Sequence, residues 1–182
     1  MFRRTTGTAA MALGCMLFLC VLILEAPKYG AQIGSISLRT IVFEPLALAT
    51  LAWLLPQCSA PRALVLVSRY LLALSLIVFG VDHFLVWIFI ANLLPAWIPW
   101  HMFWVAFFGA SFLATALSMV LRILPREAGF AMGLMFAIWV LTLHLPRVLG
   151  LYGIPGAMMN PDEWSSLFIA MGLWGGFWAA RV

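Results

Sequence analysis

Charged side chains are scarce in this chain. Only 9% of its 182 residues are Asp, Glu, Lys or Arg, whereas 65% are hydrophobic, and the mean hydropathy is +1.10. A soluble domain needs about 25% charged residues to cover its surface. The composition therefore excludes a soluble domain and predicts an integral membrane protein whose first partner is the lipid bilayer.

Basic residues are also too few and too dispersed to bind nucleic acid. The formal net charge of +4 rests on ten Lys and Arg residues, and no basic run is longer than Arg3-Arg4. Nucleic-acid binding needs a basic patch or stripe, which this pattern lacks. We therefore exclude a nucleic-acid partner and expect the basic residues to set orientation in a membrane.

Cysteines and metal-binding motifs are sparse as well. Cys15, Cys20 and Cys58 form no C-x-x-C pair, and the sequence contains no E-x-x-H pair. His83 and His144 could ligate a haem iron from two helices, but there is no C-x-x-C-H attachment motif. We therefore expect no metal site and do not favour haem as a cofactor.

Long apolar segments are what the sequence does contain. Hydropathy predicts six transmembrane helices separated by Pro and Gly. The first has the basic-then-apolar form of a signal peptide, and we interpret it as a retained transmembrane helix. Gly129-x-x-x-Gly133 and Gly172-x-x-x-Gly176 predict close helix packing, and no internal repeat is obvious. The predicted spans are 8–24, 38–55, 64–90, 101–123, 129–145 and 164–180.

The distribution of Lys and Arg predicts the orientation of these helices. With the N-terminus inside a bacterial-type cytoplasmic (inner) membrane, seven basic residues lie on the cytoplasmic side and three outside. Six spans also place the C-terminus in the cytoplasm. The cytoplasmic residues are Arg3, Arg4, Arg62, Arg69, Arg122, Arg126 and Arg181, and the outer ones are Lys28, Arg39 and Arg147.

This topology gathers polar residues in the outer half of the membrane. Asp82 and His83 lie in the outer half of the third span, and Glu44 lies in the outer third of the second. A charge at membrane depth costs about 2.5–3.5 kcal/mol, so each carboxylate needs a partner. We expect Arg147 to be that partner, with His83 and His144 nearby. The alternative is a polar network that only orients helices.

Three residues are the predicted centre of any chemistry. His144 and Arg147 are three positions apart and share a helix face, which suits binding of a carbonyl-bearing or anionic head group. The alternative is that Arg147 extends to the lipid head groups. His83 points about 100° away from Asp82 around a helix, so the two cannot face one partner. We predict His83, His144 and Arg147 as proton-transfer or head-group-binding residues.

The segment PAWIPWH, residues 95–101, predicts a break between helices. Its two prolines lack the backbone N–H and favour extended conformations before them. Trp97, Trp100 and Trp104 suit the aromatic belt at a membrane surface, and His101 begins the fourth predicted span at the outer surface. We predict an aromatic lid over Asp82 and His83, and the alternative is a turn that only lies along the membrane.

The region from about residue 69 to residue 176 resembles the DoxX-like membrane protein family. The resemblance rests on IVFGVDHF (77–84), LLPAWIPWHMFW (93–104), FFGASFLATALS (107–118), MFAIWVLTLHLPRV (135–148) and EWSSLFIAMGLWGG (163–176). It implies a four-helix core at about 64–182 within a domain of residues 61–182, preceded by a two-helix extension at 1–60. The family pattern falls on His83, Pro95, Pro99, His144, Pro146, Arg147, Glu163 and Trp164.

The resemblance implies a link to quinones, because the family takes its name from a quinone-linked thiosulfate oxidoreductase subunit. One hypothesis is therefore a quinone-linked oxidoreductase, or its quinone-facing subunit, with quinone as cofactor. The alternative is a non-catalytic accessory or assembly subunit that binds protein partners in a larger membrane complex, so whether the chain is an enzyme stays open. A small-molecule carrier is a third hypothesis, but the sequence shows no paired inverted repeat of the kind expected in carriers. The predicted pocket and lid residues are Asp82, Glu44, Trp97, Trp100, His101, Glu163 and Trp164.

Overall fold

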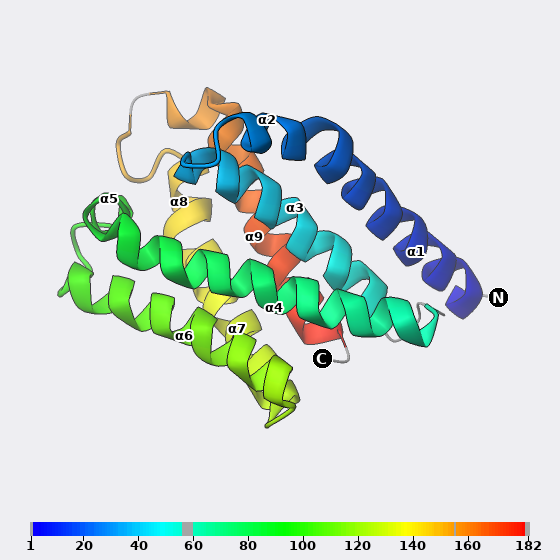
Figure 1. Ribbon diagram of the computed structural model, residues 1–182. Coiled ribbons are helices and arrows are strands. Elements are labelled where there is room, and N and C mark those ends of the chain that lie inside the picture. The colour runs from blue at the N-terminus through cyan, green and yellow to red at the C-terminus, as the bar shows by residue number, and fades with distance from the viewer. Residues whose placement is uncertain (1, 56–59, 155, 181–182) are drawn as a thin grey trace.

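The computed structural model describes residues 2–55, 60–154 and 156–180, with side chains from Thr5 onward (Figure 1). Every regular element in these ranges is a helix, which confirms the predicted all-α class. Cys58 and Arg181 lie outside the described residues. The elements are α1 (Phe2–Cys20), η1 (Val21–Glu25), α2 (Ala26–Ala31), α3 (Ile36–Leu54), α4 (Arg62–Leu85), α5 (Trp87–Leu93), α6 (His101–Leu121), α7 (Pro125–Trp139), η2 (Val140–His144), α8 (Leu145–Val148), η3 (Ala157–Met159) and α9 (Pro161–Ala179).

Five helical segments are long and apolar enough to cross a membrane. This confirms the membrane-protein prediction at the level of helix length and composition. The last predicted span corresponds to α9, which has 19 residues but is not one of the five. Asp162 and Glu163 in its first turn lower its hydropathy. The five segments are Thr5–Ala31, Ile36–Leu54, Arg62–Leu85, His101–Leu121 and Pro125–Val148.

The helices pack side by side in one bundle. Figure 1 shows α1 at one edge beside α3, α6 at the other side beside α4, and α7 and α9 behind them. Both described chain ends lie at the end of the bundle away from α2, α5 and α8. Large apolar side chains cover the outer faces of α1, α4, α6 and α7. Such a surface suits lipid as the surrounding solvent.

The helix α3 belongs to the main core rather than to a separate extension. Ala47 and Leu51 of α3 are buried in one cluster with Leu72 of α4, Phe112 of α6 and Leu173 of α9. The predicted boundary after residue 60 therefore does not coincide with a break in packing. Among the long helices described, α1 is the peripheral one, because it contributes no residue to this cluster and packs mainly on α3.

The structure reveals an internal repeat that the sequence pattern does not make obvious. Residues 21–28 read VLILEAPK and residues 140–147 read VLTLHLPR. The first five residues of each form a π-helical segment, η1 and η2, and a proline stands two residues after it. Each segment continues through a short helix toward a 19-residue helix, α3 or α9. The hairpins α1–α3 and α7–α9 are thus built alike.

Glycine–tryptophan contacts hold both hairpins closed. Gly14 lies seven residues before Val21, and its backbone meets the indole of Trp53 near the end of α3. Gly133 lies seven residues before Val140 and meets the indole of Trp178 at the same position of α9. A Cβ at either glycine would overlap the indole. The close packing predicted for Gly133 is confirmed.

The second predicted glycine pair joins α9 to α3. A Cβ on Gly172 would come within 2.8 Å of Leu48, and one on Gly176 within 2.9 Å of Leu51. Small residues at these positions allow the two helices to approach closely. Because the pair contacts α3, it ties the sixth predicted span, α9, to the N-terminal hairpin across the bundle.

Candidate functional site in the bundle interior

A cavity of about 860 Å³ lies between the helices. Residues of α3, α4, α5, α6, α7 and α9 line it, so the whole bundle contributes to its wall. A volume of this size is typical of small-molecule sites. Its polar wall residues are Ser37, Thr40, Glu44, Asp82, His83, Asp162 and Ser166, and its aromatic ones are Phe79, Phe89, Phe112, Phe136 and Trp139.

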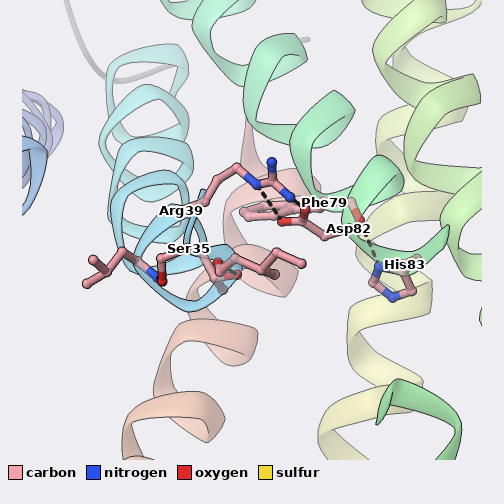
Figure 2. Close-up of polar contacts among 8 residues, drawn as sticks. Ser35, Arg39, Phe79, Asp82 and His83 are labelled. Carbon is pink, nitrogen blue, oxygen red and sulfur yellow. Dashed lines mark hydrogen bonds and ion pairs between the residues drawn. The ribbon is translucent and has the colours of Figure 1, made fainter. Parts of the chain in front are cut away.

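Asp82 is held by an arginine from α3. Its side chain accepts a hydrogen bond of 3.3 Å from Arg39 Nε at Oδ2, and Arg39 Nη2 forms an ion pair with Oδ1 (Figure 2). The residue is only 6% exposed. The predicted partner, Arg147, is wrong, because α3 rather than α8 brings a guanidinium to this carboxylate. The fork geometry satisfies both oxygens, so Asp82 serves as a clamp between α3 and α4.

His83 faces away from that clamp, as the helical angle requires (Figure 2). Its Nδ1 lies 2.8 Å from the carbonyl oxygen of Phe79. A carbonyl can only accept, so Nδ1 carries the proton and, in the neutral ring, Nε2 presents a lone pair. Nε2 is buried and has no hydrogen-bond partner within the described chain. His83 therefore lines the cavity and keeps a buried ring nitrogen whose acceptor is unused.

An indole with an unused donor lies beside this imidazole. The ring of Trp139 stacks on His83 with centroids 5.8 Å apart and an angle of 13° between the planes. Trp139 Nε1 is buried without an acceptor among the described residues. Phe112 packs against His83 at 5.2 Å. The wall thus combines one orphaned acceptor and one orphaned donor in an aromatic setting, which is costly unless a ligand or water satisfies them.

Glu44 is the carboxylate at the cavity that has no partner. It lines the cavity from α3 and is half-buried, and its side chain makes no hydrogen bond or ion pair with any described residue. Pro45 follows it inside α3. Because proline has no N–H, the carbonyl of Ile41, which also lines the cavity, loses its helical donor. This part of the wall is therefore rich in acceptors.

Three of the other predicted site residues, His144, Arg147 and Glu163, line a second, smaller cavity of about 170 Å³. Arg147 Nε donates a 2.8 Å hydrogen bond to Glu163 Oε2, and Nη2 forms an ion pair with Oε1. His144 lies beside them on the same wall. Asp162 and Ser166 line both cavities. The predicted cluster is thus divided in two, with the start of α9 between the parts.

The proline–tryptophan turn does not roof either cavity. Trp97 and Trp100 are 64% and 79% exposed and line neither described cavity. His101 donates from Nε2 to the carbonyl of Pro95 at 3.1 Å. Trp164 is likewise turned to its own loop, with Nε1 bonded to Met158 O at 2.9 Å. The prediction of an aromatic lid is therefore wrong. His101 and Trp164 instead form hydrogen bonds to nearby backbone carbonyls in their own loops.

The wall above Asp82 and His83 comes instead from α5. The helix α4 ends at Leu85, and Val86 adopts φ −120° and ψ 35° before α5 begins. Val86, Phe89 and Ile90 line the cavity. Hydropathy cannot reveal this break, since residues 64–90 are predominantly apolar and contain no proline.

Sequence reasoning missed Arg39 and Trp139 as site residues. The predicted topology places Arg39 on the outer side, toward which Asp82 also lies, and this was the available signal for the pair. Trp139 lies within a long apolar span, and nothing in the sequence distinguishes it from the other apolar residues there. Only packing shows that it faces His83.

Comparison of the chain with models of known protein families, with curated proteins and with solved structures gives no match. The fold and the cavity define the class of the protein: an all-helical chain with five helices able to span a membrane and a polar cavity inside the bundle. The resemblance to the DoxX-like family stays a prediction.

Proposed function

We propose that the chain is a membrane subunit that binds a quinol or quinone in its interior cavity. The observation that carries this proposal is that two stacked rings lining the cavity each keep an unsatisfied polar atom, the acceptor His83 Nε2 and the donor Trp139 Nε1–H. A hydroxyl group donates one hydrogen bond and accepts another. A hydroxyl-bearing aromatic ring therefore satisfies both groups, and the apolar walls receive its isoprenoid tail.

The cavity suits the reduced form better than the oxidised form. A quinol carries two hydroxyl donors, and the wall offers two acceptors, His83 Nε2 and the Glu44 carboxylate. Oxidation of a quinol releases two protons and two electrons. His83 and Glu44 would take the protons, and a two-electron acceptor on a partner subunit would take the electrons.

A second function is supported by the ion pairs. Arg39–Asp82 joins α3 to α4, and Arg147–Glu163 joins α8 to α9. These four side chains already satisfy one another, so they fit the accessory-subunit hypothesis, in which polar residues only fix helix packing. The proposal therefore assigns ligand contact to His83, Glu44 and Trp139, and structural roles to the paired residues.

The proposal also includes the membrane arrangement. We infer that α9 is a sixth span whose acidic first turn lies at the outer surface. The chain would then lie in a bacterial-type cytoplasmic membrane with both termini on the cytoplasmic side. The chain would then keep the four-helix core implied by the DoxX-like resemblance. The bundle supports this arrangement, because the start of α1 and the end of α9 lie at the same end of it in Figure 1.

Binding of decylubiquinol to the purified protein in lipid nanodiscs tests the proposal. His83→Phe keeps a stacking ring but removes the Nε2 acceptor, so we expect about tenfold weaker binding, in line with a hydrogen bond worth ~1.4 kcal/mol. Titration calorimetry measures the change, and solvent extraction identifies any quinone retained during purification.

His101→Phe is the matched control, since His101 bonds within its own loop and lines neither described cavity. Binding should be unchanged in this variant. Equal affinity of wild type and His83→Phe would refute the assignment of His83. Absence of saturable quinol binding would refute the proposed function and leave the accessory role as the better account.

A further inference from the structure

The cavity has an imbalance of charge that a quinol does not explain. Asp82 is neutralised by Arg39, but Glu44 and Asp162 have no ion-pair partner among the described residues. No unpaired Lys or Arg lines the described wall. Two carboxylates therefore face the cavity without a compensating cation.

The remaining polar groups are mostly acceptors too. His83 presents the Nε2 lone pair because Phe79 O holds the proton on Nδ1. The Ile41 carbonyl lacks its helical donor because of Pro45. Trp139 Nε1 is the one buried donor without an acceptor on the described wall, and the Ser37 and Ser166 hydroxyls that also line the cavity are exposed. A ligand that fits must bring donors, and preferably positive charge.

The apolar part of the wall is aromatic. Four aromatic rings that line the cavity form a chain of edge-to-face contacts. The chain runs from Phe79 to Phe112, Phe136 and Trp139. The faces of such rings attract cations, by about 2 kcal/mol or more in a desolvated site. An unpaired carboxylate beside aromatic faces is a combination that recognises an organic cation.

We propose that the cavity binds an organic cation: a protonated amine carried on an apolar, preferably aromatic, body. Glu44 supplies the counter-charge, the aromatic wall supplies the cation–π and apolar contacts, and the His83 and Ile41 acceptors take the N–H donors. An uncompensated carboxylate is expensive in a low-dielectric interior. A cationic ligand provides the missing partner, which a neutral quinol cannot do. This inference does not depend on the quinol proposal, although the two ligands would compete.

Two probes of the same shape test the role of charge. 4-Phenylbutylamine is cationic at pH 7, whereas 4-phenylbutan-1-ol is neutral, and both can donate a hydrogen bond. Binding is measured by titration calorimetry in nanodiscs of zwitterionic lipid, with empty nanodiscs subtracted to remove partitioning. We expect the amine to bind at least about tenfold more tightly than the alcohol.

Variants then locate the effect. Glu44→Gln keeps an acceptor oxygen but removes the charge, so amine binding should fall at least about tenfold. Glu127→Gln, at the exposed start of α7 and lining neither described cavity, is the matched control and should leave amine binding unchanged. Thermal unfolding verifies that Glu44→Gln remains folded, which we expect because the change removes an unpaired carboxylate.

Two results would overturn the inference: equal binding of amine and alcohol to the wild type, or equal amine binding to the wild type and Glu44→Gln. Neither result overturns the quinol proposal, which is tested by decylubiquinol binding to the wild type and to His83→Phe. Conversely, failure of decylubiquinol to bind would leave the amine result intact, so the two proposals fail separately.

Discussion

At the scale of single residues, pairing decides which polar groups are structural and which are available. Asp82 and His83 are neighbours in sequence, yet one is bound by Arg39 and the other keeps a free ring nitrogen. Glu44, a helical turn beyond Arg39 in α3, has no partner among the described residues. The same residue types therefore serve different roles because of what lies opposite each of them.

Asp82→Asn should destabilise the protein strongly. The substitution leaves the Arg39 guanidinium, whose side chain is 21% exposed, without its counter-charge, at a cost of about 3 kcal/mol. The double variant Arg39→Met with Asp82→Leu should recover much of that loss, since apolar residues replace the whole pair. Thermal unfolding in detergent measures each member of the cycle.

The surface pair Lys28–Glu25 is the control for this cycle. Its side chains are 3.1 Å apart but far more exposed, so Glu25→Gln should cost less than about 1 kcal/mol. Strictly additive effects of the Arg39 and Asp82 substitutions would contradict the role of the pair as a coupled clamp.

At the scale of elements, the two repeated hairpins show how a local pattern is reused. Each combines a glycine, a π-helical segment and a proline, and each closes by a glycine–tryptophan contact. Their surroundings differ, because α7 packs on α6 and lines the cavity, whereas α1 stays at the edge of the bundle. The repeated pattern therefore sets the geometry of each hairpin, whereas the helices packed around a hairpin determine whether it lines the cavity.

Gly14→Ala and Gly133→Ala should both destabilise the protein, by about 1–3 kcal/mol each. In each case the new Cβ overlaps an indole, Trp53 or Trp178, and forces the helices apart. Gly175→Ala is the control within α9, because nothing lies within 4 Å of its Cβ position. This variant should be neutral or slightly more stable, since alanine favours helix.

Thermal unfolding of the three glycine variants distinguishes packing from helix propensity. If Gly133→Ala were as stable as Gly175→Ala, the contact with Trp178 would not hold the hairpin together. If only Gly14→Ala were neutral, the N-terminal hairpin would be the more adaptable copy of the repeat.

At the scale of the whole molecule, the number of crossings sets which side each end of the bundle faces. Five helices qualify as spans by length and apolarity, and α9 is the element that decides between five and six. With five spans the two termini would lie on opposite sides of the membrane. With six they lie on the same side.

Single-cysteine labelling decides between these arrangements. In a background without Cys15, Cys20 and Cys58, Met159→Cys should react with a membrane-impermeant maleimide on intact bacterial cells, because Met159 is 86% exposed in the loop before α9. Arg126→Cys and a cysteine added after Val182 should react only after permeabilisation. Labelling of the added C-terminal cysteine on intact cells would indicate five spans.

Much of the architecture follows from the sequence alone, because hydropathy over about 20 residues reports directly on the surrounding solvent. The all-helical class, the apolar spans and the close packing at Gly133, Gly172 and Gly176 were all readable. So was the presence of polar residues at membrane depth, including Asp82, His83 and Glu44. These features depend on composition and spacing along one helix.

Only the tertiary structure decided which residues meet. The pairing of Asp82 with Arg39 rather than Arg147, the stacking of Trp139 on His83, and the cavity wall built by α5 all depend on neighbouring helices and their rotation. An apolar helix in a membrane is hydrophobic on nearly every face, so its sequence carries little information about orientation. The free acceptors of Glu44 and His83 therefore became visible only when the helices were packed together.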